Sequence, residues 1–146
     1  MNPISFSNQI HQGIDRIVLE MAMQIGLPPD QIKPIGQASS IALKVQGLPD
    51  VMLSVAEDRL WIWSLLPIHD ERSLMLHASE ALSILTTAIE GVETGQLTLG
   101  MSEHGYELKA LVELDLLKRD HGLKQVFQGF VAQLYRFCEV YQIKGA

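Results

Sequence analysis

The segment from Arg59 to Leu66, with the sequence RLWIWSLL, places the tightest limit on how this chain can fold. In an extended strand Leu60 and Ile62 point to one side, and Trp61 and Trp63 point to the other. Both faces are therefore apolar, which is typical of a strand in the middle of a sheet. A single layer of helices covers only one face, so the question of function becomes what covers the second.

Two short alternating segments, residues 41–45 and 51–56, precede this strand and predict a hairpin with a five-residue loop. If residues 57–58 alone form the next turn, Leu53 lies opposite Ile62, and Met52 lies opposite Trp63. One face then collects Ile41, Leu43, Val45, Val51, Leu53, Val55, Leu60 and Ile62. The other face mixes apolar and polar groups: Ala42, Lys44, Met52, Ser54, Trp61 and Trp63. We expect the first face to be core and the second to be a surface that carries two tryptophans.

The rest of the chain reads as helices and a second hairpin. Apolar residues at three- and four-residue steps predict helices from Ser7 to Ile25, from Ser73 to Glu90, and from Leu123 to Tyr141. The proline-rich region from Pro28 to Ser40 is predicted to be a loop, and residues 96–101 and 106–114 are predicted to be strands. The order is α-β-β-β-α-β-β-α, which predicts a single α+β domain over residues 1–146, with a five-stranded antiparallel sheet and three helices.

Charge and composition exclude several classes of partner. The chain has 17 acidic and 11 basic side chains and a net charge of −6, so nucleic acid would be repelled. The N-terminus lacks the pattern of a signal peptide, and no apolar run is long enough for membrane insertion. Cys138 is the single cysteine, which excludes an internal disulfide and is typical of a core residue in a reducing cytoplasm. We expect a cytoplasmic protein.

The sequence does not indicate catalysis. The five histidines, His11, His69, His77, His104 and His121, have no metal-ligand spacing, so we predict no metal and no cofactor. The acidic pairs at 57–58 and 70–71 lie at a tight turn and at a helix start, where capping or solvation explains them. No nucleotide-binding motif or nucleophile motif is present, and no histidine or acid is arranged around Ser39 and Ser40. We therefore predict no catalytic residue and no enzymatic activity.

What remains is apolar surface, at the two tryptophans and on helix residues such as Leu19 and Met23. On a small acidic domain such surface indicates oligomerisation or binding of a partner chain.

Three segments, EDRLWIWSLL, ILTTAIEGVETGQLTLG and YELKALVELDLL, resemble the class I (IB) chaperones of bacterial type III secretion, in particular the InvB or SpaK (surface presentation of antigens) group. The likeness extends from the first predicted helix to the last. It implies a homodimeric, non-enzymatic chaperone that binds the N-terminal chaperone-binding segments of several secreted effectors and keeps them competent for export. It also implies the secretion ATPase as a further partner. Such effectors add a strand to a sheet edge and fill apolar pockets.

The resemblance also implies two sets of residues. Family dimers are built around the second helix and the neighbouring strand, which here correspond to Leu82, Leu85, Ile89, Leu97 and Leu99. Effector pockets are lined by the first helix and the first three strands, which here correspond to Ile14, Val18, Ile41, Leu43, Trp61 and Trp63. The predicted register places Ile41 and Leu43 on the face opposite the tryptophans, so one pocket contains all of them only if it wraps around the sheet edge.

Two other functions fit the same fold. A dimeric regulatory or scaffolding module would bind a folded partner, and limited proteolysis of the bound partner would separate it from a chaperone. A small-molecule enzyme that uses one of the histidines is the third hypothesis.

Overall fold

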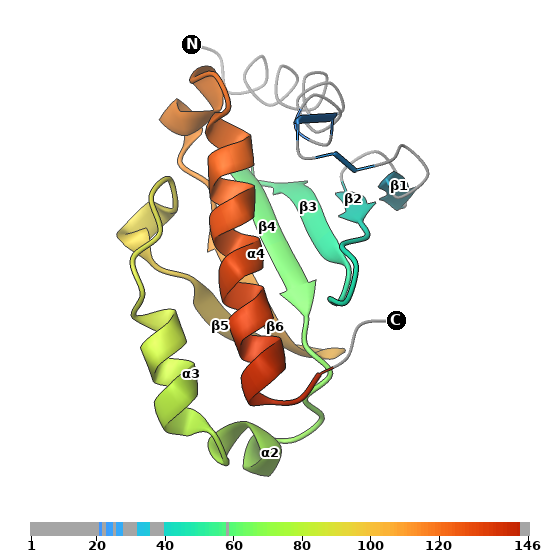
Figure 1. Cartoon of the computed structure of the whole chain (residues 1–146), viewed down its shortest axis with the longest axis vertical. Helices are drawn as coiled ribbons and strands as arrows, with labels where there is room; N and C mark the ends of the chain where they lie inside the picture. Colours follow the sequence, from blue (N-terminus) through green and yellow to red (C-terminus); the bar gives the residue numbers. More distant parts are fainter. Residues whose placement is uncertain are drawn as a thin grey trace.

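The computed structural model describes residues 21, 23–24, 26–27, 32–35, 40–57 and 59–143. In these residues an antiparallel sheet has six strands in the order β1-β2-β3-β4-β6-β5 (Figure 1). The strands are β1 (Ile32–Ile35), β2 (Ser40–Leu43), β3 (Val51–Ala56), β4 (Arg59–Leu65), β5 (Thr98–Ser102) and β6 (Gly105–Leu111). Because β4 pairs with β3 on one side and β6 on the other, the tryptophan strand is central, as predicted.

The register predicted between β3 and β4 is confirmed. Met52 pairs with Trp63, and Leu53 pairs with Ile62. The predicted core face is buried, because all its members except the partly buried Val45 are at most 7% exposed: Ile41, Leu43, Val51, Leu53, Val55, Leu60 and Ile62. The sheet and the helices packed against it confirm the α+β class and all five predicted strands.

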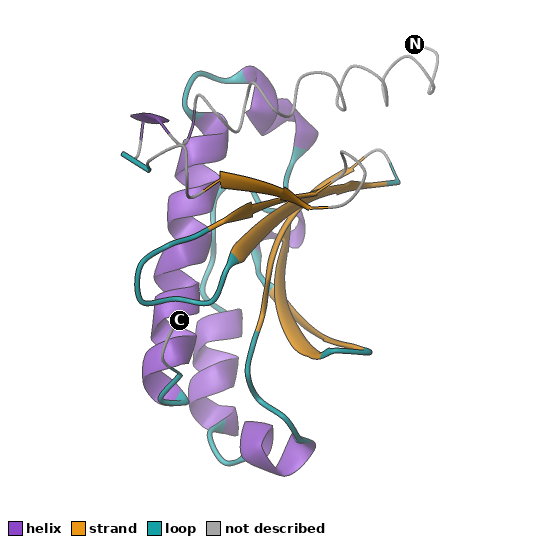
Figure 2. Cartoon of the chain, turned by 90° about the vertical axis from the view of Figure 1, so that its right-hand side faces the viewer, coloured by secondary structure: helices purple, strands orange, loops and turns teal. Residues whose placement is uncertain are grey.

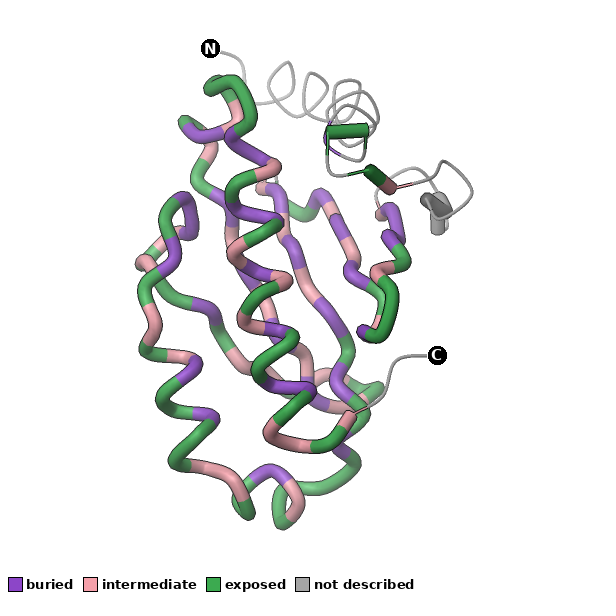
Figure 3. Tube along the Cα trace, in the orientation of Figure 1, coloured by how far each residue is buried: buried purple, intermediate pink, exposed green. Residues whose placement is uncertain are grey.

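Helices cover the aliphatic face. Among the described residues these are α3 (Ala78–Leu85) and α4 (Gly122–Val140), while the short α2 (Glu71–Met75) lies beyond the end of the sheet (Figure 2). Figure 2 shows α3 and α4 on the same side of the sheet, and Figure 3 shows buried residues recurring along α4. The helix predicted from Leu123 to Tyr141 forms the main lid on this face. Its apolar stripe is partly buried at Val131 and Tyr141 and buried at Leu123, Val126, Phe127, Phe130, Leu134, Phe137 and Cys138. The first predicted helix lies mostly outside the described residues, of which Met21, Met23 and Gln24 are helical.

The loop predicted from Pro28 to Ser40 is wrong in its central part, where β1 pairs with β2. Ile32 lies opposite Leu43, and Pro34 lies opposite Ile41. Proline hides a strand from sequence analysis because it cannot donate a backbone hydrogen bond, but it is tolerated on an edge strand, which is the position of β1. The sheet therefore has one strand more than the five predicted.

The single helix predicted from Ser73 to Glu90 is also wrong, because the chain forms α2 and α3 with a break between them. The hydroxyl of Tyr141, at the end of α4, donates a hydrogen bond of 2.7 Å to the carbonyl of Leu74. In a continuous helix that carbonyl would accept from the amide of Ala78. Here it accepts from the Tyr141 hydroxyl and, at 3.4 Å, from the amide of His77.

Candidate functional site

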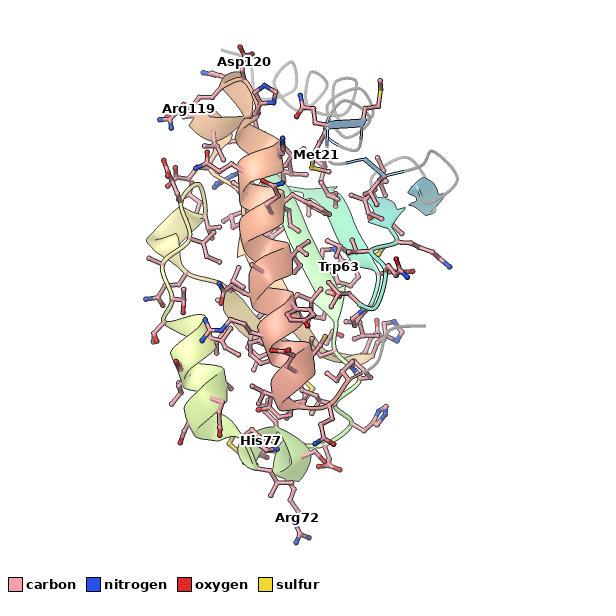
Figure 4. The ribbon with its side chains drawn as sticks, viewed as in Figure 1. Met21, Trp63, Arg72, His77, Arg119 and Asp120 are labelled. Atoms are coloured by element: carbon pink, nitrogen blue, oxygen red, sulfur yellow. The ribbon has the colours of Figure 1, made fainter. Side chains whose placement is uncertain are left out.

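The face of the sheet opposite α3 and α4 carries both tryptophans, which are partly exposed. In Figure 2 α2, α3 and α4 leave this face of the sheet uncovered, and in Figure 4 Trp63 lies far from the α2–α3 break marked by His77. The pairing of β3, β4 and β6 brings together one set of outward-facing side chains. We call this surface the tryptophan face and define it by Met52, Ser54, Trp61, Trp63, Leu65, Glu107 and Lys109.

A hollow of about 440 Å³ opens beside Trp63. Its apolar wall comes from three sources: β3, β4 and the loop between β2 and β3. Charged side chains of both signs stand among them, so an entering apolar group would have polar neighbours. The residues that line the hollow are Lys44, Leu48, Pro49, Asp50, Met52, Trp63, Leu65, His104 and Glu107. A space of this kind is suited to apolar side chains of a partner chain.

A second hollow of about 210 Å³ lies beside Trp61. It is lined by Ser54, Ala56, Trp61, Trp63, Glu107 and Lys109. Trp63 and Glu107 contribute to both hollows, so the two are neighbours on one surface. Lys109 and Glu107, which both line the smaller hollow, form an ion pair with an N–O distance of 3.1 Å. The tryptophan face therefore offers two neighbouring hollows whose shared wall includes a neutralised carboxylate.

Hydrogen bonds fix the walls of the larger hollow. The indole Nε1 of Trp63 donates to the hydroxyl of Ser54 at 2.9 Å, and the hydroxyls of Ser54 and Ser40 are 2.8 Å apart. On the core side, the fully buried Ser64 donates to the carbonyl of Asp50 at 2.8 Å, which ties the β2–β3 loop to β4. Sequence analysis missed the roles of Ser54 and Ser40. The available signal was the register, which places Ser54 opposite Trp61 and two residues from Met52, the partner of Trp63.

The effector-binding residues predicted from the resemblance lie in different places. Trp61 and Trp63 lie on the tryptophan face, whereas Ile41 and Leu43 are 7% and 0% exposed and belong to the core on the opposite face. The register therefore separates the two pairs, as expected, and leaves Ile41 and Leu43 almost no surface for a partner. Ile14 and Val18 lie outside the described residues.

The residues predicted to form a dimer interface differ in exposure. Leu82 on α3 is 61% exposed, Leu85 and Leu99 are partly buried, and Ile89 and Leu97 are 8% and 4% exposed. Ile89 and Leu97 thus pack into the core of their own chain. The other exposed apolar side chains near Leu82 in the sequence are Met75 and Leu76, at 54% and 73%. The sequence analysis did not predict an exposed position for these two residues, because it placed them inside one continuous helix.

The titratable groups have structural explanations. Asp70 caps α2 by accepting the Ser73 amide at 2.6 Å, and this hydrogen bond lowers the pKa of its carboxyl. Burial raises the pKa of the Cys138 thiol to about 11, which keeps it protonated. In the described part of the chain no three His, Cys, Asp or Glu side chains are placed to bind a metal ion. Within the same residues, no helix is long and apolar enough to cross a membrane.

Residues 26–103 match the Invasion protein B family. Two relatives, each called surface presentation of antigens protein SpaK, come from Salmonella typhimurium and Salmonella typhi. Each is 32% identical to this chain over 134 residues, which cover 90% of this chain and 94% of the relative. The chain belongs to the Invasion protein B (SpaK) family.

Proposed function

We propose that this protein is a cytoplasmic chaperone of a bacterial type III secretion system that binds the N-terminal segments of several effectors and keeps them stable and competent for secretion. One observation carries the proposal: a central sheet strand presents two tryptophans on a face that α2, α3 and α4 leave uncovered. Membership of the Invasion protein B family supports it. The chain acts by binding, without catalysis and without a cofactor.

The tryptophan face suits an unfolded segment better than a folded partner. Its hollows, of about 440 and 210 Å³, have room for a few side chains rather than for a broad convex surface. The backbone groups of β3, β4 and β6 are already paired, so a segment on this face contributes side chains alone. Among the six described strands, its backbone can pair only at a sheet edge, beside β1 or β5. A segment that runs from an edge onto the face would use both kinds of contact.

The proposal assigns effector contacts first to Trp61 and Trp63. Ile14 and Val18 remain proposed effector contacts, and Ile41 and Leu43 support the effector-binding strands from the core. Homodimerisation is assigned to the α3 region around Leu82 and Leu85, with Ile89, Leu97 and Leu99 packed beneath or beside it. Met75 and Leu76 extend the exposed apolar surface there. The secretion ATPase is a further proposed partner.

Co-expression with secreted proteins of the same system tests the proposal. The chaperone should retain an effector through its N-terminal segment, and limited proteolysis of the complex should cut the effector readily on either side of the contacts because this region is not folded. The double variant Trp61→Ala/Trp63→Ala should lose the effector. Tyr135→Ala is the matched control, because Tyr135 is an exposed aromatic residue on α4, at 55% exposure. A retained partner that resists proteolysis would instead favour a module that binds folded proteins.

A further inference from the structure

The hydroxyl of Ser54 has two partners on the tryptophan face. The indole Nε1 of Trp63 donates to it at 2.9 Å, and the hydroxyl of Ser40 lies 2.8 Å away. Ser40 pairs directly with Ser54 across β2 and β3, whereas Trp63 pairs with Met52, two residues from Ser54. The three side chains therefore join β2, β3 and β4 across the outside of the sheet.

The hydrogen bond to Ser54 selects one orientation of the indole. A tryptophan on an open sheet face has several staggered rotamers and no close packing on its outer side to choose among them. The Trp63–Ser54 bond requires the ring to reach diagonally across β3, a distance that long aromatic side chains can span. Met52, Trp63 and Leu65 then line the hollow of about 440 Å³. A ring that turned freely would change the shape of that hollow.

We infer that Ser54 is a positioning residue that holds the indole of Trp63 in its binding orientation, and that Ser40 holds Ser54 in turn. The inference rests on the proposed function, because it concerns how the effector site is prepared. A wall fixed before binding reduces the entropy that the complex loses when it forms. Ser54 therefore contributes to affinity through the orientation of Trp63, besides lining the smaller hollow itself.

Indole NMR tests the bond in the free protein. Trp61→Phe and Trp63→Phe assign the two indole Nε1–H resonances. In Ser54→Ala the Trp63 resonance should shift and its hydrogen should exchange faster with solvent, and Ser54→Thr, which keeps a hydroxyl, should restore both. Ser40→Ala should have a smaller effect in the same direction. Ser79→Ala is the control, since Ser79 is exposed on α3 and its hydroxyl makes no hydrogen bond within the described residues.

Binding then tests the consequence. The probe is a synthetic peptide with the N-terminal sequence of an effector that the wild-type protein retains. Ser54→Ala should weaken its binding roughly three- to tenfold, the range expected for one net hydrogen bond, and Ser54→Thr should bind as the wild type does. An unchanged Trp63 resonance in Ser54→Ala, or equal losses of affinity in Ser54→Ala and Ser54→Thr, would overturn the inference. Failure of the proposed function is separate: the wild-type protein would then retain no effector, whereas the indole resonances of Ser54→Ala and Ser54→Thr would still report the Trp63–Ser54 bond.

Discussion

Trp63→Ala and Phe130→Ala should separate partner binding from stability. Phe130 is 0% exposed in the core beneath α4, so its truncation removes buried area and leaves a closed cavity, at a cost of roughly 3–5 kcal/mol. Trp63 is partly exposed beside a hollow that opens to solvent. Its truncation leaves no closed cavity and removes one hydrogen bond to Ser54, so we expect a cost of about 1–2 kcal/mol.

Phe130→Ala should lose more stability than Trp63→Ala, but Trp63→Ala should lose more affinity for the partner. A tryptophan that anchors a partner is commonly worth at least 2 kcal/mol, which is roughly a 30-fold loss of affinity. Urea unfolding measures the stability of each variant, and calorimetric titration with an effector segment measures affinity below the unfolding transition. Trp63→Ala should fold and bind poorly, and Phe130→Ala should lose stability while its folded fraction still binds. If both variants merely unfold, or if Trp63→Ala binds normally, the tryptophan face is not the site.

Three further predictions concern packing, pH and association. Gly122→Ala should lower the free energy of unfolding by roughly 2–4 kcal/mol in a urea titration, because the new Cβ would collide with the carbonyl of Leu116. Gly100→Ala is the control and should be near neutral, because its Cβ would meet only the Lys109 side chain, at 3.7 Å. Burial raises the pKa of the Cys138 thiol from 9.0 to about 11. The protonated thiol therefore makes its full contribution to the free energy of unfolding below pH 9, and this free energy should fall by up to about 2–3 kcal/mol as the pH rises to 11. Cys138→Ala should flatten that fall, and an equal slope in both proteins would contradict the assignment. Leu82→Asp should leave stability nearly unchanged, because Leu82 is 61% exposed, but should shift light-scattering mass from dimer to monomer if α3 forms the interface.

The central strand, its register and the lid helix could be predicted because local patterns determine them. The alternation in Arg59–Leu65 and the two-residue turn that precedes it are enough to place Met52 opposite Trp63. The same alternation correctly assigns the two faces of the sheet. The surface that carries the tryptophans therefore follows from residue spacing alone.

The errors arise where distant contacts override local patterns. Pro34 makes its segment look like a loop, and only the neighbouring strand β2 shows it to be an edge strand. Beside the break between α2 and α3, the Leu74 carbonyl accepts from the hydroxyl of Tyr141, 67 residues further along the chain. The link from Trp63 to Ser54 and Ser40 likewise requires three strands to be side by side. Sequence spacing does not contain these relationships.

Light scattering coupled to size-exclusion chromatography tests the central claim most directly, on the protein alone and after co-expression with secreted proteins of the same system. The account predicts a homodimer that gains the mass of one effector chain, and it predicts that Trp61→Ala/Trp63→Ala remains a dimer but gains none. A monomer that retains no secreted protein, or a double variant that retains an effector as the wild type does, would contradict it.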